Sequence, residues 1–413
     1  MEPEPEPDTE EGEPPEALCR THSTYQEYIK YGISAKGLRH VATEFQIGAG
    51  TTTSDLCQLF IKARTLPPGW KDEPKLTDKK NRYYSHKYVK DHTAERVDLP
   101  PDGTRSMCEV LLENPDTQHF VSKPTHFLSH AWVFLFLNLL LGVEDFVSGL
   151  PEGEPEPFFW FDCFSLDQHA QSGQGSDWWR VTFLEAIGAI GHTVMMLSPW
   201  DNPTPLTRAW CLWELYCTHK AGKPFSVCLG PDERKEFEEA ILANTAVVFD
   251  VFSKISVEKA KSGSESDEKM IKEVVAKEVG FSNLNGIAFA RMRDWIFGVA
   301  RDLAEKATEE GLDGLRKKGQ VGVLFAKFGL PDDAERLFKE VIAGRTEHYG
   351  PNHVETLTTK GILANLRWRQ GHIDEARDTF RQVVAGYQQQ QLSPEHPWLV
   401  WAKGRFKRLK VSG

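Results

Sequence analysis

The sequence predicts an α/β fold with an open, mostly parallel sheet, followed by an all-α region of helical hairpins. Two observations support this. Short apolar runs alternate with helical patterns between Pro124 and Thr218, which is typical of parallel strands joined by helices. From Leu315 onward the chain is helical and repeats itself. At 413 residues and 40 % apolar content, it is long enough for two or three domains with real cores.

The N-terminal part begins with an acidic segment. Residues 1–19 carry eight acidic groups and no basic ones, so we expect residues 1–20 to be a disordered tail. The whole chain has 49 basic and 60 acidic residues, a net charge of −11, which argues against nucleic-acid binding through bulk charge. Residues 21–122 mix helical patches with polar loops and indicate no particular fold.

Three apolar runs between residues 123 and 222 predict the strands of an α/β domain. They are Thr125–Ser129, Phe158–Asp162 and Thr193–Ser198, and each ends in a polar residue. In an open parallel sheet, ligands bind at the carboxyl ends of the strands. We therefore expect Ser129 and Asp162 at the edge of a binding site.

The next segment, residues 223–314, reads as a helical connecting region. Its pattern is helix-biased from Phe225, and it is interrupted at residues 261–266 by a polar stretch rich in serine. This stretch predicts a flexible insertion between charged helical segments.

Residues 315–413 contain two related units. Shifting residues 318–344 by 42 positions gives ten identities in 27, far above the one or two expected by chance. Each unit reads as a helix ending at a glycine turn, then an aspartate (Asp332, Asp374) as N-cap of a second helix. A capping helix is expected at residues 398–408.

The cysteines and the apolar segments indicate the compartment. The seven cysteines are odd in number and include no C-x-x-C pair, so we expect a reduced, cytoplasmic protein. No secretory signal pattern is present at the start of the chain. The longest apolar stretch, residues 131–143, is shorter than the roughly 20 residues that span a bilayer, so we expect no membrane span.

His126 and His130 lie on a strand and its loop rather than on one helix face, so no metal site is predicted.

These motifs resemble known families. The 42-residue units, with the loop at residues 350–353, resemble the tetratricopeptide repeats of kinesin light chains. The segment Phe127–His130, the strand ending in Asp162 and the run Arg208–Leu215 resemble a Toll/interleukin-1 receptor (TIR) domain. Residues 128–132 and 160–163 also resemble the heterokaryon-incompatibility (HET) domain of fungi. The combination resembles algal and protist proteins that are often labelled kinesin light chain.

The resemblance to TIR domains implies a candidate catalytic residue. In the enzymatic members, the glutamate of W-x-x-x-E is needed to cleave the bond between nicotinamide and ribose in NAD, and Glu214 occupies the matching position. Trp210 lies one helical turn before it, so both side chains share a face. Arg208 is a candidate for binding phosphate, and Trp132 and Trp200 follow strand ends where a base could stack.

Two functions remain open on this basis. The leading one is an intracellular signalling or scaffold protein whose repeats bind a protein partner and whose TIR-like domain self-associates. The alternative is an NAD glycohydrolase or cyclase that uses Glu214, with NAD as substrate and no resident cofactor. A structural role explains these residues equally well. Glu214 near a helix N-terminus interacts favourably with the helix dipole, and Trp210 can pack in the core.

Overall fold

The computed structural model describes residues 29–79, 83–91, 93, 96–98, 100–169 and 176–411. The expected acidic tail, residues 1–20, lies outside the described residues. The chain divides into two compact units. Unit 1 contains the residues up to Ser198 together with Pro203–Gly230 and Ser256–Leu284, and unit 2 contains Pro199–Asn202, Pro231–Ile255 and Asn285 onward.

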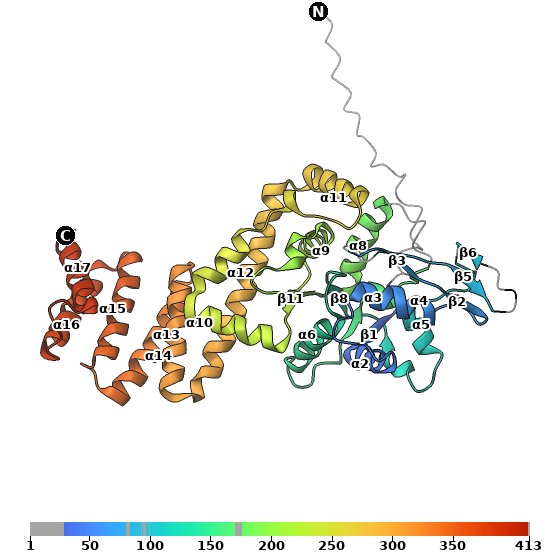
Figure 1. Cartoon of the computed structure of the whole chain (residues 1–413). Helices are drawn as coiled ribbons and strands as arrows, with labels where there is room; N and C mark the ends of the chain where they lie inside the picture. Colours follow the sequence, from blue (N-terminus) through green and yellow to red (C-terminus); the bar gives the residue numbers. More distant parts are fainter. Residues whose placement is uncertain are drawn as a thin grey trace, which may run out of the picture. The chain divides into compact units, whose positions relative to one another are not determined.

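Unit 1 is built on a six-stranded sheet in the order β11-β10-β8-β9-β1-β7. Figure 1 labels three of its strands, β11, β8 and β1. The strands are β1 (Gly32–Ser34), β7 (Val121–Ser122), β8 (His126–Ser129), β9 (Phe158–Trp160), β10 (Thr193–Met196) and β11 (Phe225–Cys228). The first four in this order pair in parallel, whereas β1 is antiparallel to both β9 and β7. The three predicted strands therefore form and lie side by side, but the sheet as a whole is mixed.

Three strands of this sheet were not predicted. β11 lies at the start of the stretch interpreted as helix-biased, and it pairs with β10 along four residues. β1 and β7 come from the flanking region of residues 21–122, which the sequence pattern left without a fold. The flanking region is thus an integral part of the sheet.

Helices pack against this sheet, and their apolar side chains form a core together with those of the strands. Those of unit 1 are α2 (Ala35–Glu44), α3 (Thr53–Asp55), η2 (Leu56–Ile61), α4 (Lys62–Arg64), α5 (Met107–Leu112), η3 (Gln118–Phe120), α6 (Phe136–Ser148), α7 (Asp162–Ser165), α8 (Ser176–Ile190), η5 (Thr204–Thr207), α9 (Ala209–Lys220), η6 (Val257–Lys259) and α11 (Glu265–Glu278). Fully buried side chains of α2, α6 and the strands, such as Leu38, Leu139 and Phe159, form one continuous core. Burial of this apolar surface is the main force that holds the sheet and its helices together.

Two small sheets also form in unit 1, within the flanking region where helical patches and polar loops were expected. One contains β2 (Trp70–Asp72), β5 (Tyr88–Lys90) and β6 (Arg96–Val97), and the other contains β3 (Lys75–Asp78) and β4 (Tyr83–Ser85). Their exposed faces are polar, which is why the sequence does not distinguish them from loops.

Unit 2 contains α10 (Pro231–Ser253) and most of α12 (Phe281–Lys306), then η7 (Ala307–Glu309) and five further helices. These are α13 (Gly311–Lys327), α14 (Pro331–Tyr349), α15 (Val354–Arg369), α16 (Ile373–Gln389) and α17 (Pro397–Val411) (Figure 1). The two predicted hairpins are α13/α14 and α15/α16, and α17 is the expected cap.

The 42-residue repeat of the sequence is also a repeat of the structure. Gly329 and Gly371 end the first helix of each hairpin with φ near +90°, a conformation that favours glycine. Gly344 and Gly386 are spaced by the same 42 residues, and a Cβ at either position would lie within 3 Å of a leucine side chain, Leu315 or Leu357 respectively. The expectation that aspartates cap the second helices was wrong. The N-cap residues are Leu330 and His372. The aspartates lie inside the first turn, where their negative charge interacts favourably with the helix dipole.

Among the described residues, no helix combines the length and apolar character needed to cross a bilayer.

Candidate functional site

A cavity of about 510 Å³ opens in unit 1 at the carboxyl ends of β8 and β9. Its wall combines the strand ends, α9, the small-sheet region and the loop before α11. The lining residues are Ser54, Gln58, Tyr84, Phe127, Leu128, His130, Trp132, Val133, Trp160, Asp162, Phe183, Arg208, Trp210, Cys211, Glu214, Ser262, Gly263, Ser264 and Asp267. This is the position at which open parallel sheets bind their ligands.

Glu214 is the buried carboxyl group of this cavity. It lies on α9, only 8 % of its surface is exposed, and the Ser129 hydroxyl donates a 2.5 Å hydrogen bond to Oε2. The pKa of Glu214 is raised from 4.5 to about 8, chiefly because the carboxyl group is buried. The Ser129 hydrogen bond and Arg208 oppose this rise, and Asp162 contributes to it. The carboxyl group is therefore mostly protonated at neutral pH.

Arg208 and Trp210 lie on the same wall as Glu214. A short parallel bridge between Arg208 and Lys261 joins the start of α9 to the loop before α11. The Trp210 indole N–H donates to Asp267 Oδ2 at 3.3 Å, so the first turn of α11 also fixes the indole ring. The stretch at residues 261–266 was expected to be a flexible insertion, but part of it forms the cavity wall.

Aromatic rings form a second wall. The rings of Phe127 and Trp160 are stacked with their centroids 4.9 Å apart, and Phe183 packs edge-on against Trp160. Phe183 also contacts Trp210 at 5.4 Å between ring centroids. Flat apolar surfaces of this kind suit an aromatic base.

Asp162 lines the cavity and accepts hydrogen bonds from two donors. Its Oδ2 accepts a 2.8 Å hydrogen bond from the Trp132 indole N–H, and its Oδ1 accepts one of 2.7 Å from the Cys163 backbone. His130 Nε2 lies 3.8 Å from Asp162 Oδ1. Trp132 is thus anchored by Asp162, and its ring lines the cavity.

Five of the seven residues predicted from the sequence line this cavity: Glu214, Trp210, Arg208, Trp132 and Asp162. Ser129 does not line it, because it is fully buried behind Glu214 and acts through its hydrogen bond. Trp200 is not among the lining residues. It belongs to unit 2, where its ring packs edge-on against Phe237 at 5.5 Å between ring centroids.

Sequence reasoning missed part of the cavity. Ser54, Gln58 and Tyr84 come from the flanking region, and no motif marks them. Trp160 and Phe183 lie in apolar stretches that read as core, so no signal separated them from ordinary packing residues. His130 was noted only as a poor partner for His126, yet it faces the cavity beside Asp162.

Comparison with known proteins identifies four helices of unit 2. The tetratricopeptide repeat family model matches residues 316–389, which span α13 to α16. A crystal structure of kinesin light chain TPR-like repeats from Podosopora anserina is similar at 18 % sequence identity, with a TM-score of 0.26, covering 44 % of this chain and 85 % of that one. No curated protein matches the chain. Residues 316–389 are therefore tetratricopeptide repeats, as the sequence pattern predicted.

Proposed function

We propose that the chain is a scaffold protein whose tetratricopeptide repeats bind a protein partner. The observation that supports this is the pair of hairpins matched by the family model, since such repeats generally bind proteins. One valine of the first hairpin and one of the following helix, α17, are the most exposed large apolar side chains among the described residues. Val323 on α13 is 45 % exposed and Val400 on α17 is 53 % exposed. Apolar side chains exposed in this way are candidate contacts for a partner.

Affinity purification of the tagged full chain from its native cells, followed by cross-linking mass spectrometry, tests this proposal. We expect one enriched protein whose cross-links fall on residues 311–411 and whose recovery drops at least tenfold with Val323→Asp or Val400→Asp. Leu141→Asp is the matched control, because Leu141 is an exposed apolar residue of α6 in unit 1. Equal recovery with all three variants would contradict partner binding by the repeats.

A second candidate function concerns the cavity of unit 1. We propose that it cleaves the bond between nicotinamide and ribose in NAD, in line with the resemblance of residues 123–222 to TIR and HET domains. The supporting observation is that the Glu214 carboxyl group reaches a cavity that also contains Arg208 and Trp210. Self-association through this domain belongs to the same proposal.

The chemistry of the cavity fits this reaction. Cleavage of the glycosidic bond passes through a ribose with oxocarbenium character, which a carboxylate beside it stabilises. The aromatic wall offers a surface for a base, and the Arg208 guanidinium offers a fork for a phosphate oxygen. The nicotinamide ring of NAD carries a positive charge, so its binding beside Glu214 favours the ionised carboxylate.

Free nicotinamide, measured by chromatography after incubating the full chain with NAD at high protein concentration, tests this candidate. We expect release by the wild type and at least a hundredfold lower release by Glu214→Gln. Glu152→Gln is the control, because Glu152 is an exposed glutamate in a loop of the same unit. Absence of release from the assembled wild type would contradict the enzymatic proposal and leave the scaffold proposal standing.

A further inference from the structure

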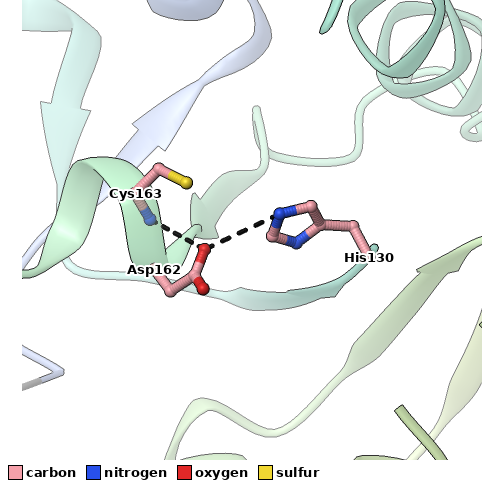
Figure 2. Close-up of side chains that lie close together, drawn as sticks. All are labelled: His130, Asp162 and Cys163. Atoms are coloured by element: carbon pink, nitrogen blue, oxygen red, sulfur yellow. Dashed lines mark hydrogen bonds and ion pairs between the residues drawn. The ribbon is translucent and has the colours of Figure 1, made fainter. Parts of the chain in front are cut away.

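Three side chains of different chemistry meet beside the cavity, of which two line it and one is fully buried. They are His130, which follows β8, and Asp162 and Cys163, which begin α7 after β9. One ligand-type atom from each lies within 4.8 Å of the other two: an imidazole nitrogen, a carboxylate oxygen and a thiol sulfur. Figure 2 shows His130 and Asp162 pointing toward each other, with the Cys163 sulfur on the same side.

His130 Nε2 is the atom that indicates a ligand. Its side chain is 3 % exposed, and Nε2 has no hydrogen-bond partner among the residues that the structure describes. The carboxylate oxygen nearest to it, Asp162 Oδ1, is 3.8 Å away, which is too long for a hydrogen bond. A buried polar nitrogen without a partner is costly, and metal coordination is one way to satisfy it.

Neighbouring residues orient these three side chains, as the residues around the ligands of a metal site do. The His130 ring donates a hydrogen bond to the backbone carbonyl oxygen of Leu128 and packs edge to face with the Phe161 ring. Asp162 is oriented by the indole of Trp132 and by the backbone N–H of Cys163. Such contacts fix the direction of ligands and conserve the geometry of a site.

We propose that His130, Asp162 and Cys163 bind one divalent transition-metal ion, best fitted by zinc, with the fourth position facing the cavity. Tetrahedral zinc has bonds of about 2.0 Å to nitrogen and oxygen and about 2.3 Å to sulfur, which places its ligand atoms roughly 3.3–3.6 Å apart. The 3.8 Å between His130 Nε2 and Asp162 Oδ1 shortens by a few tenths of an ångström on binding, and since all three ligand atoms lie within 4.8 Å of one another, no pair closes by more than about 1.5 Å. Nitrogen, oxygen and sulfur together favour zinc over magnesium or calcium.

Binding of the ion involves no change of oxidation state. The Cys163 sulfur gives its proton to solvent and forms the bond to the metal, and His130 binds as the neutral imidazole through Nε2. Three protein ligands leave one position for water or for an anionic oxygen of a molecule in the cavity, the arrangement of reactive rather than purely structural zinc sites. The proposal does not depend on Glu214 or on NAD.

Titration of the chelator-treated, untagged full chain with Co²⁺ tests the site. We expect one equivalent of Co²⁺ to produce the sulfur-to-cobalt charge-transfer absorption, and zinc to displace it. Cys163→Ser should abolish this absorption, and His130→Gln should weaken cobalt binding at least tenfold. Cys228→Ser, which changes a buried cysteine of β11, should leave both unchanged.

X-ray absorption at the zinc edge of the wild type keeps the test independent of whether the variants fold. We expect one sulfur at about 2.3 Å and nitrogen or oxygen neighbours at about 2.0 Å. A shell of oxygen alone, as acidic surface groups would give, overturns the proposal. So does a charge-transfer absorption that survives in a folded Cys163→Ser variant, or a wild type that binds no cobalt.

Discussion

The buried carboxyl group of Glu214 makes the stability of unit 1 depend on pH, and Glu214→Gln should remove that dependence. Glutamine has nearly the same shape and still accepts the hydrogen bond from Ser129, but it does not ionise. In the folded protein Glu214 keeps its proton up to about pH 8, whereas in the unfolded chain it loses the proton near 4.5. Between these values the folded state binds more protons, so the free energy of unfolding falls as pH rises.

The size of the effect follows from the two pKa values. The difference of about 3.5 pKa units corresponds to about 4–5 kcal/mol, lost between roughly pH 4.5 and pH 8 and fully lost above it. The free energy of unfolding of Glu214→Gln, relative to that of the wild type, should therefore increase by this amount as the pH rises from 4.5 to 9. The difference between the two proteins should be smallest at pH 4.5, where Glu214 is protonated in the folded state and half protonated in the unfolded chain.

Urea unfolding of the wild type and of Glu214→Gln at intervals from pH 4.5 to pH 9, followed by tryptophan fluorescence, measures the difference. Only the difference between the two proteins is used, because other groups titrate equally in both. Glu152→Gln supplies a second baseline, since its side chain is exposed. A difference that stays constant across this range, within about 1 kcal/mol, would refute the assignment of a raised pKa to Glu214.

The other predictions concern the repeats and a histidine pair. Phe338 is 1 % exposed, so Phe338→Ala should lower the free energy of unfolding of the repeats by about 3–5 kcal/mol in urea titrations, and a loss below 1 kcal/mol would contradict its core role. A Cβ at Gly314 would lie 1.8 Å from a backbone carbonyl oxygen, so Gly314→Ala should lower the melting temperature. Gly319→Ala in the same helix meets open space and should raise it, and the reverse order would refute the packing argument. Burial and the neighbouring His192 lower the pKa of His126 to about 4, so its ring should titrate near pH 4 by NMR, and a midpoint near 6.5 would contradict that burial.

The fold was predictable where local pattern determines structure. β8, β9 and β10 are continuous apolar runs, and the runs are bounded by polar residues, so their existence follows from sequence. β1 and β7 are only three and two residues long, and their pairing joins segments about 90 residues apart. Such non-local pairing leaves no local signal.

The candidate site divides in the same way. Trp210 and Glu214 were predictable as neighbours because one helical turn places them on one face, and both line the cavity. The contact of Ser129 with Glu214 joins β8 to α9 and required the fold. Trp200 was expected at the cavity because it follows a strand end, but the chain after that strand passes into unit 2.

The pH dependence of nicotinamide release by the wild type and by Glu214→Gln tests the enzymatic account most directly. Because kcat/KM reports the groups of the free enzyme, we expect it to rise from pH 6 to pH 9 with an apparent pKa near 8 in the wild type. Glu214→Gln should stay at the rate of NAD without protein throughout. A profile that is flat or falls over this range, or a Glu214→Gln variant with the wild-type profile, would contradict the role of the Glu214 carboxylate.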